Sequence, residues 1–208
     1  MKPISNIKVY DLEESMRAAG YPMRTDLNEA PDFAKDWERA RRLTKASRFN
    51  PAHAQFLTGI VVNFDLTFSN KAWIEAGRYK FLYYVSSQST MHCATKFDLS
   101  AQCNEYVDER IIAIVQEYID LYNSLTAQDE ETIKFKKNLY LKILYNIPPG
   151  FQLTARMTTN YRCLLNIYNQ RHDHRLPEWR EFCNQLLEEL PFFRELVEAY
   201  MNKEIKEE

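Results

Sequence analysis

The stretch that decides the fold runs from Phe151 to Arg171 and reads FQLTARMTTNYRCLLNIYNQR. In its first half apolar and polar residues alternate, which predicts a β-strand with one buried and one polar face. Thr158 or Thr159 is then expected to cap a helix. The chain therefore passes from a strand directly into a helix. The alternating apolar residues are Phe151, Leu153, Ala155 and Met157.

The helical half carries polar residues where a packed helix usually carries aliphatic ones. At about 100° per residue, Asn160 and Arg171 fall inside the apolar arc. A buried asparagine or arginine without partners costs about 1–3 kcal/mol or more. Two alternatives follow: both residues lie at the helix ends in water, or both face a polar ligand. The apolar arc contains Tyr161, Cys163, Leu164, Leu165, Ile167 and Tyr168, and the opposite polar ridge contains Arg162, Asn166 and Asn169.

Composition limits the class of protein. A chain of 208 residues with 45% hydrophobic residues predicts one globular domain over residues 1–208. Because the chain has no internal repeats and no low-complexity linker, its expected strands and helices form one α+β domain. Only 4 glycines are present, which argues against a glycine-rich phosphate loop or a dinucleotide fingerprint. The net charge of −2 gives no basic field for a nucleic-acid polymer.

Cysteine usage and the N-terminus indicate a reducing compartment. The four cysteines form no C-x-x-C pair, so neither a zinc site nor a disulfide framework is expected. The N-terminal sequence lacks the apolar segment of a signal peptide, and no run approaches 18 apolar residues. We therefore expect a cytoplasmic protein with no metal and no membrane partner. The cysteines are Cys93, Cys103, Cys163 and Cys183.

The rest of the chain predicts further strands and helices. The clearest strand is the period-two stretch from Val62 to Phe68, followed by Ser69 as a helix cap. The segment from Arg78 to Met91 is expected to be a loop with partial order. Other expected elements are a strand within Ile4–Asp11 and helices from Asp32, from Asn70 to about Gly77, over Asn104–Leu125, over Thr132–Tyr145, and from Pro177 to about Lys203.

The helix from Asp32 carries a group of cations, Arg39, Arg41, Arg42 and Lys45. One interpretation is a solvated face with partners such as Glu38 four residues before Arg42. The alternative is that this face makes the chain a small helical interaction protein.

The helix of the opening stretch resembles the C-terminal signature of the flavin-dependent thymidylate synthases. That signature is Asn-x-Arg-x-x-x-Asn-x-x-x-x-Arg, followed by an acidic residue, a histidine-containing turn and a tryptophan. The resemblance implies that the asparagines and the first arginine line a flavin pocket, and that the last arginine reaches the pyrimidine of a nucleotide. The matching residues are Asn160, Arg162, Asn166 and Arg171, then Asp173, His174 and Trp179.

A looser resemblance covers the family motif Arg-His-Arg-x-x-Ser-x-Asn-x-x-Ser-x-Arg-Tyr. Arg78-Tyr79-Lys80 occupies the Arg-His-Arg position, and Lys80 keeps the charge without the planar fork of arginine. The nucleotide-contacting serine corresponds to Gln88. The phosphate-binding arginine corresponds to Thr90, which cannot make a charge-assisted bidentate contact. Ser87 and Ser89 flank Gln88 and are the neighbouring candidates, Ser87 for substrate binding and Ser89 for catalysis.

The resemblance also implies a fold and partners. The family fold is α+β, with a central antiparallel sheet flanked by long helices, and the family is homotetrameric with sites built across subunit boundaries. Lys142 lies near a family arginine that binds nucleotide phosphate, and His53 lies near a flavin-contacting histidine. The implied cofactor is FAD, and the implied partners are dUMP, methylenetetrahydrofolate and NADPH.

The implied reaction is methylation of C5 of a deoxypyrimidine monophosphate, dUMP to dTMP. In this family no enzyme cysteine attacks the pyrimidine, and the flavin supplies the difficult chemistry. Arg78 and Lys80 would then hold the flavin and its phosphates, and Arg171 would polarise the pyrimidine carbonyl. The alternative is a catalytically degenerate homologue that binds a nucleotide or a partner protein, which the departures at Tyr79, Gln88 and Thr90 favour.

Two other groups of residues allow a functional interpretation. His172-Asp173-His174 could bind a metal, but histidines two residues apart do not share a helical face, so a hydrophilic helix terminus is favoured. The tyrosines Tyr79, Tyr83 and Tyr84 could stack on a base or a flavin ring, or they are ordinary half-buried tyrosines.

Overall fold

The computed structural model describes residues 2–202, which form two compact units. The first unit contains the described residues up to Leu66, the segment Gly77–Val85, and the described residues from Arg156 onward. The second contains Thr67–Ala76 and Ser86–Ala155. The single domain over residues 1–208 stays a prediction.

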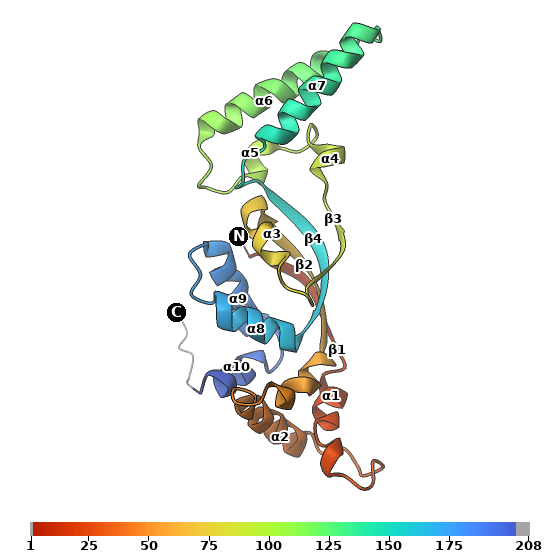
Figure 1. Cartoon of the computed structure of the whole chain (residues 1–208), viewed down its shortest axis with the longest axis vertical. Coiled ribbons are helices and arrows are strands. Elements are labelled where there is room, and N and C mark those ends of the chain that lie inside the picture. The colour runs from red at the N-terminus through yellow and green to blue at the C-terminus, as the bar shows by residue number, and fades with distance from the viewer. Residues whose placement is uncertain (1, 203–208) are drawn as a thin grey trace. The chain divides into compact units, whose positions relative to one another are not determined.

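The strands form one four-stranded sheet in the order β1-β2-β4-β3 (Figure 1). β1 pairs antiparallel with β2, with an irregularity between Ser5 and Lys8. The predicted α+β class with an antiparallel sheet is confirmed. The alternation of apolar and polar residues explains why β2 forms a strand inside the sheet, because every second side chain lies in the core. Four of these side chains are fully buried: Val62, Phe64, Leu66 and Phe68. The strands are β1 (Ile4–Tyr10), β2 (Val61–Ser69), β3 (Tyr83–Ser87) and β4 (Gln152–Asn160).

Strand β3 lies inside the segment that the sequence predicted to be a loop, so that prediction is wrong for Tyr83–Ser87. All five of its residues are exposed, and β3 lies at the end of the strand order. A strand with no buried face shows no alternation of apolar and polar residues, which is the pattern that identifies strands in a sequence. A short helix, α4 (Thr90–Cys93), follows it.

The helices of the first unit pack around a core of large apolar side chains. α2 packs against α1, α10 and η2, and α8 packs against η2 and α9 (Figure 1). Trp179, Tyr161 and Phe64 are among the largest fully buried side chains. The helices are α1 (Leu12–Ala18), α2 (Phe33–Ala46), α8 (Tyr161–Arg171), α9 (Pro177–Glu189) and α10 (Phe193–Met201), with the 3-10 helices η1 (Tyr21–Met23) and η2 (Pro51–Thr58).

Helix α2 buries a charged residue on its inner face. Asp36 is 2% exposed, and its Oδ1 accepts hydrogen bonds from Arg24 Nη2 at 3.0 Å and Arg39 Nη1 at 2.5 Å. Arg39 therefore does not belong to the solvated basic face that the sequence predicted, because it neutralises a buried carboxylate. The remaining cations of that face are exposed, namely Arg41, Arg42 and Lys45.

The prediction of a single C-terminal helix from Pro177 to about Lys203 is wrong, because α9 and α10 are separate helices. The backbone N–H of Leu190 still donates to Leu186, but Pro191 has no N–H to continue the helix. Phe192 then takes a left-handed conformation with φ of 59°, which redirects the chain into α10. Lys203 lies outside the described residues.

The second unit contains a pair of long helices, α6 and α7, which pack along each other (Figure 1). Its buried cluster includes Leu99, Ile143 and Phe151. The helix expected from Asn104 begins at Glu109, because Asp108 accepts the backbone N–H of Arg110 and caps it. The helices are α3 (Asn70–Ala76), α4, α5 (Leu99–Gln102), α6 (Glu109–Ser124) and α7 (Glu130–Asn146).

The described residues can be compared with the requirements of a membrane span, a metal site and a disulfide. None of the helices within residues 2–202 combines the length and apolar character that crossing a membrane requires. In the same residues, no group of three His, Cys, Asp or Glu side chains is placed to hold a metal ion. All four cysteines are free thiols, and Cys163 and Cys183 are buried.

Candidate functional site: a cationic cavity at the start of α8

The first unit contains a cavity of about 760 Å³ beside the start of α8. This volume lies in the range of roughly 300–1,000 Å³ that small-molecule and cofactor sites occupy. Three segments form its wall: the 3-10 helix η2, the segment 78–81 before β3, and the first turns of α8. The lining residues are Gln55, Thr58, Arg78, Tyr79, Lys80, Phe81, Asn160, Arg162, Cys163 and Asn166.

Asn160 is the residue that begins α8, so the predicted cap at Thr158 or Thr159 is wrong. Asn160 has extended backbone angles, and its Oδ1 accepts the backbone N–H of Cys163 at 2.9 Å. Strand β4 therefore continues through Asn160 before the helix starts. Because the cap uses only the carbonyl oxygen, the amide nitrogen of this side chain can donate to a ligand in the cavity.

Replacement of Asn160 by alanine should lower the free energy of unfolding by about 1 kcal/mol, because one helical N–H loses its acceptor. Asn160→Ser is the matched control. Its hydroxyl can still cap the helix, so its stability should stay within about 0.5 kcal/mol of the unsubstituted protein. Urea denaturation of both variants measures the difference, and equal losses in the two would contradict the capping role.

Arg162 joins the cavity wall of α8 to that of η2. Its Nη1 donates to the side-chain oxygen of Gln55, and its Nη2 donates to the carbonyl oxygen of Pro51 at 3.3 Å. Both acceptors are neutral, so the charge of Arg162 is not cancelled by these two contacts. The guanidinium is thereby held at the cavity in a fixed orientation.

The chemistry of the lining suits an anionic ligand with an aromatic part. Three cations line the cavity, Arg78, Lys80 and Arg162, and none of the described residues lining it is acidic. Arginine and lysine bind phosphate oxygens through charge-assisted hydrogen bonds. Tyr79 and Phe81 add aromatic surface for a planar ring. These residues fit a flavin nucleotide, whose diphosphate is anionic and whose ring is planar.

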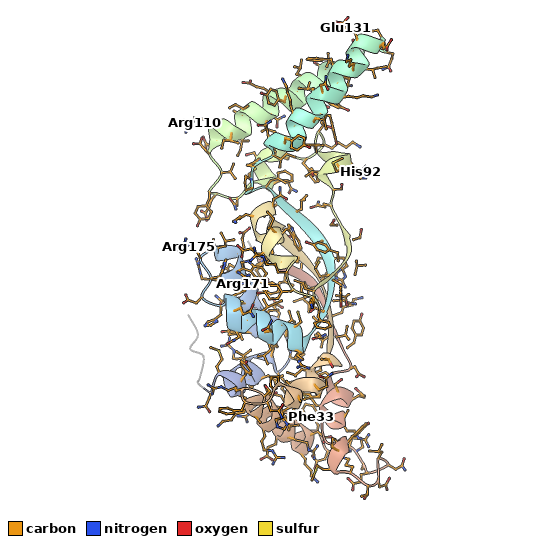
Figure 2. All side chains as sticks on the ribbon, viewed as in Figure 1. Phe33, His92, Arg110, Glu131, Arg171 and Arg175 are labelled. Carbon is orange, nitrogen blue, oxygen red and sulfur yellow. The ribbon has the colours of Figure 1, made fainter. Side chains whose placement is uncertain are left out.

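Arg171 is the last residue of α8 (Figure 2). It does not line the cavity, but it is hydrogen-bonded to a residue that does. Its Nε donates to the hydroxyl of Tyr79 at 2.8 Å, and its Nη1 donates to His174 Nε2 at 2.7 Å. The guanidinium carbon lies 5.1 Å from the ring centroid of Trp179 and 5.7 Å from that of Tyr79. Asn160 and Arg171 therefore both lie at the ends of α8, although Arg171 is packed among aromatic rings rather than left in water.

Burial keeps the ionisable neighbours of this region protonated. It raises the pKa of the Tyr79 hydroxyl, an effect that the hydrogen bond from Arg171 partly offsets. It also raises the pKa of the Cys163 thiol at the cavity wall, and it raises the pKa of Cys183 to about 12. Since the thiolate is the reactive form of cysteine, neither thiol is activated as a nucleophile.

Apart from Arg171, the residues expected at the nucleotide belong to the second unit. The side-chain oxygen of Gln88 accepts the backbone N–H of Thr154 at 2.9 Å, and the backbone N–H of Gln88 donates to the carbonyl oxygen of Thr154 at 2.9 Å. Ser89 precedes α4 and makes no capping hydrogen bond through its side chain. Ser87 is exposed in β3, and Lys142 is exposed on α7 with its Nζ 5.9 Å from the Tyr118 ring centroid.

The cavity brings together five of the six residues expected to bind a flavin. His53 is exposed on η2 and is not among the lining residues, whereas Gln55, two positions later, lines the cavity and holds Arg162. The sequence does not mark Gln55, Thr58 or Phe81 as site residues, because uncharged residues in a short 3-10 helix or before an edge strand form no recognisable pattern. The five residues that meet at the cavity are Arg78, Lys80, Asn160, Arg162 and Asn166.

The remaining tyrosines and histidines have other surroundings. Tyr83 and Tyr84 are about half exposed and do not line the cavity, unlike Tyr79. His172 stacks on Tyr168 with ring centroids 5.1 Å apart and an interplanar angle of 8°. His174 contacts Arg171 and Trp179. The two histidines thus have aromatic and arginine neighbours, and the interpretation as a helix terminus describes their placement.

Comparison with known proteins gives a relationship at the level of the fold. No protein-family model matches the sequence, and no curated protein is detectably similar to it. Among solved structures, thymidylate synthase X (ThyX) from Helicobacter pylori with FAD and dUMP has a TM-score of 0.66 at 15% identity, covering 94% of this chain and 99% of that one. A second structure of the flavin-dependent enzyme ThyX from Helicobacter pylori, also with FAD and dUMP, has a TM-score of 0.64 at 15% identity, covering 93% and 97%. Over nearly its whole length, the chain therefore has the α+β fold of these flavin-dependent thymidylate synthases.

Proposed function

We propose that the chain binds FAD in the cavity at the start of α8 and methylates C5 of a deoxypyrimidine monophosphate, dUMP to dTMP. The observation that carries this proposal is the convergence of Arg78, Lys80 and Arg162 with two asparagine amides on a cavity that has no described acidic lining residue. The fold shared with ThyX structures that contain FAD and dUMP supports it.

The residues of the chain have distinct roles in this proposal. Arg78, Lys80 and Arg162 hold the flavin phosphates, and Asn160 and Asn166 donate amide hydrogen bonds to polar atoms of the cofactor. Arg171 binds the pyrimidine and stabilises negative charge that develops on its carbonyl oxygen. When bound, FAD supplies hydride transfer between NADPH and the carbon unit.

The overall reaction balances with methylenetetrahydrofolate as the carbon donor. The hydrogen at C5 of dUMP leaves as a proton, and the methylene group of the folate forms a bond to C5 while its two bonds to the folate nitrogens break. These nitrogens take up two protons, one equivalent to the proton released from C5 and one from the solvent. A hydride that originates from NADPH reduces this methylene to a methyl group, so the products are dTMP, tetrahydrofolate and NADP⁺. We propose a homotetramer in which a second subunit completes the nucleotide site.

Replacement of Arg162 by alanine should weaken FAD binding about tenfold or more, since it removes a charge-assisted contact and the link to η2. Fluorescence titration with FAD measures the effect, and thermal unfolding without cofactor tests whether the variant is folded. The matched control is Arg110→Ala, which removes an exposed arginine on α6 whose ion pair is with Asp108. Formation of dTMP from dUMP, methylenetetrahydrofolate and NADPH is then assayed with FAD present. Failure of the unsubstituted protein to bind FAD would refute the proposed function.

A second candidate is a degenerate homologue that keeps the flavin cavity but does not methylate the nucleotide. It is favoured by Thr90 in the position of the phosphate-binding arginine, and by Gln88, whose side-chain oxygen already accepts a backbone hydrogen bond. The same assay separates the two candidates, because binding of FAD without formation of dTMP supports the second one.

A further inference from the structure

We propose that Tyr79 is a positioning residue: its hydroxyl sets the orientation in which the Arg171 guanidinium meets the pyrimidine. This inference rests on the proposed function, in which Arg171 binds the nucleotide. Tyr79 occupies the place of the histidine in the Arg-His-Arg motif, so its role is a property of this chain. The residue acts through Arg171 and is not itself catalytic.

Tyr79 contacts Arg171 through its hydroxyl group and its ring. The Nε–H of Arg171 donates to the Tyr79 hydroxyl at 2.8 Å, which defines the direction of the guanidinium plane. The Arg171 guanidinium carbon also lies 5.7 Å from the Tyr79 ring centroid, within the range of a cation–π contact. The Tyr79 ring in turn packs edge-on against the fully buried Trp179, with centroids 5.9 Å apart. A long arginine side chain with many rotamers is thereby confined before a ligand binds.

The hydroxyl of Tyr79 also connects Arg171 to the cavity wall. It donates to Gln170 Oε1 at 3.0 Å, and Gln170 Nε2 donates to Asn166 Oδ1 at 3.1 Å. Asn166 lines the cavity, as Tyr79 itself does. The hydrogen bonds therefore run from Arg171 through Tyr79 and Gln170 to Asn166. In each of them a donor group meets an acceptor group.

The protonation state of Tyr79 matches this arrangement. Tyr79 must keep its proton to donate to Gln170 while it accepts from Arg171. Burial raises the pKa of its hydroxyl, so the neutral phenol persists at physiological pH. Substitution by phenylalanine removes both hydrogen bonds and leaves the ring in place.

The first measurement detects the restraint without any nucleotide. The Arg171 Nε–H signal in a nitrogen–proton NMR spectrum is the one that disappears in Arg171→Lys. The exchange of this proton with water is then recorded in the unsubstituted protein. Tyr79→Phe should accelerate this exchange about tenfold or more, because the hydrogen bond that protects Nε–H is lost. Tyr83→Phe is the matched control, since Tyr83 is 54% exposed and lies four residues away.

The second measurement tests the role of the restraint in binding. Tyr79→Phe should weaken dUMP binding about tenfold, measured by calorimetry, while FAD affinity changes less than about threefold. Tyr79→His restores an acceptor for Nε–H and should recover part of the dUMP affinity. A residue with a merely structural role would weaken FAD and dUMP binding together and would lower the melting temperature without rescue.

The outcomes separate this inference from the proposed function. Unchanged Arg171 exchange in Tyr79→Phe, or equal losses of FAD and dUMP affinity, would overturn the inference while leaving the enzyme assay valid. If Arg171 is protected but the unsubstituted protein binds neither FAD nor dUMP, the proposed function fails and Tyr79 holds Arg171 only structurally. Accelerated exchange together with selective loss of dUMP binding supports the inference.

Discussion

Replacement of Asp36 by alanine should lower the free energy of unfolding by about 3–5 kcal/mol, the usual result of breaking a buried ion pair by removing one partner. The Asp36 side chain is 3% exposed, and it accepts hydrogen bonds from two arginines that are themselves largely buried, Arg24 and Arg39. Without the carboxylate, both guanidinium groups remain in a low-dielectric environment with no counter-charge. Urea unfolding followed by tryptophan fluorescence measures the loss, because Trp37 lies on the same helix.

The matched control for Asp36 is an ion pair on the surface. Glu189 pairs with Lys2 at 3.2 Å, and the two side chains are 40% and 66% exposed. Glu189→Ala should therefore cost less than about 1 kcal/mol. A loss for Asp36→Ala no larger than that for Glu189→Ala would show that the two arginines find other acceptors or water, contrary to the buried arrangement.

Replacement of Phe64 by alanine should also lower the free energy of unfolding by about 3–5 kcal/mol, because it opens a cavity in the core of the first unit. Phe64 is fully buried in β2, and its ring centroid lies 6.0 Å from that of Phe182 on α9. The strand holds this side chain on the buried face of the sheet, so the surrounding residues can only partly close the space. Urea denaturation monitored by circular dichroism gives the value.

Phe49 provides the control with identical chemistry, since it is 89% exposed. Phe49→Ala should change the free energy of unfolding by no more than about 0.5 kcal/mol. Similar effects of the two substitutions would contradict the placement of Phe64 in the core.

The sequence predicted well those elements in which one face is buried and the other is not. Strand β2 was expected because its four inward side chains alternate with polar ones, and all four are fully buried. Ser69 was expected to cap the next helix, and its hydroxyl accepts the backbone N–H of Ala72 at 3.2 Å. In both cases the determining interactions are between residues close in sequence, so their spacing carries the information.

Other features could not be predicted, either because their partners are distant in sequence or because the local pattern of apolar residues does not reveal them. Asp36 receives a hydrogen bond from Arg24, 12 residues away and across a loop, so the charged face of α2 gave no sign that part of it is buried. Strand β3 has no buried face and hence no alternation. The break at Pro191 was visible as a residue, but the continuous apolar stripe on both sides suggested one helix.

The candidate site divides in the same way. Helical periodicity placed Arg162 and Asn166 on one polar ridge and Asn160 on the opposite arc, and the family resemblance implied that all three line one pocket. Only the tertiary structure decided which residues these side chains contact. The 3-10 helix η2 and the segment 78–81 complete the cavity, and the Tyr79 hydroxyl accepts a hydrogen bond from Arg171, 92 residues away. Local periodicity specifies which face of an element a residue lies on. The partner on that face depends on how distant segments pack, and no local spacing records it.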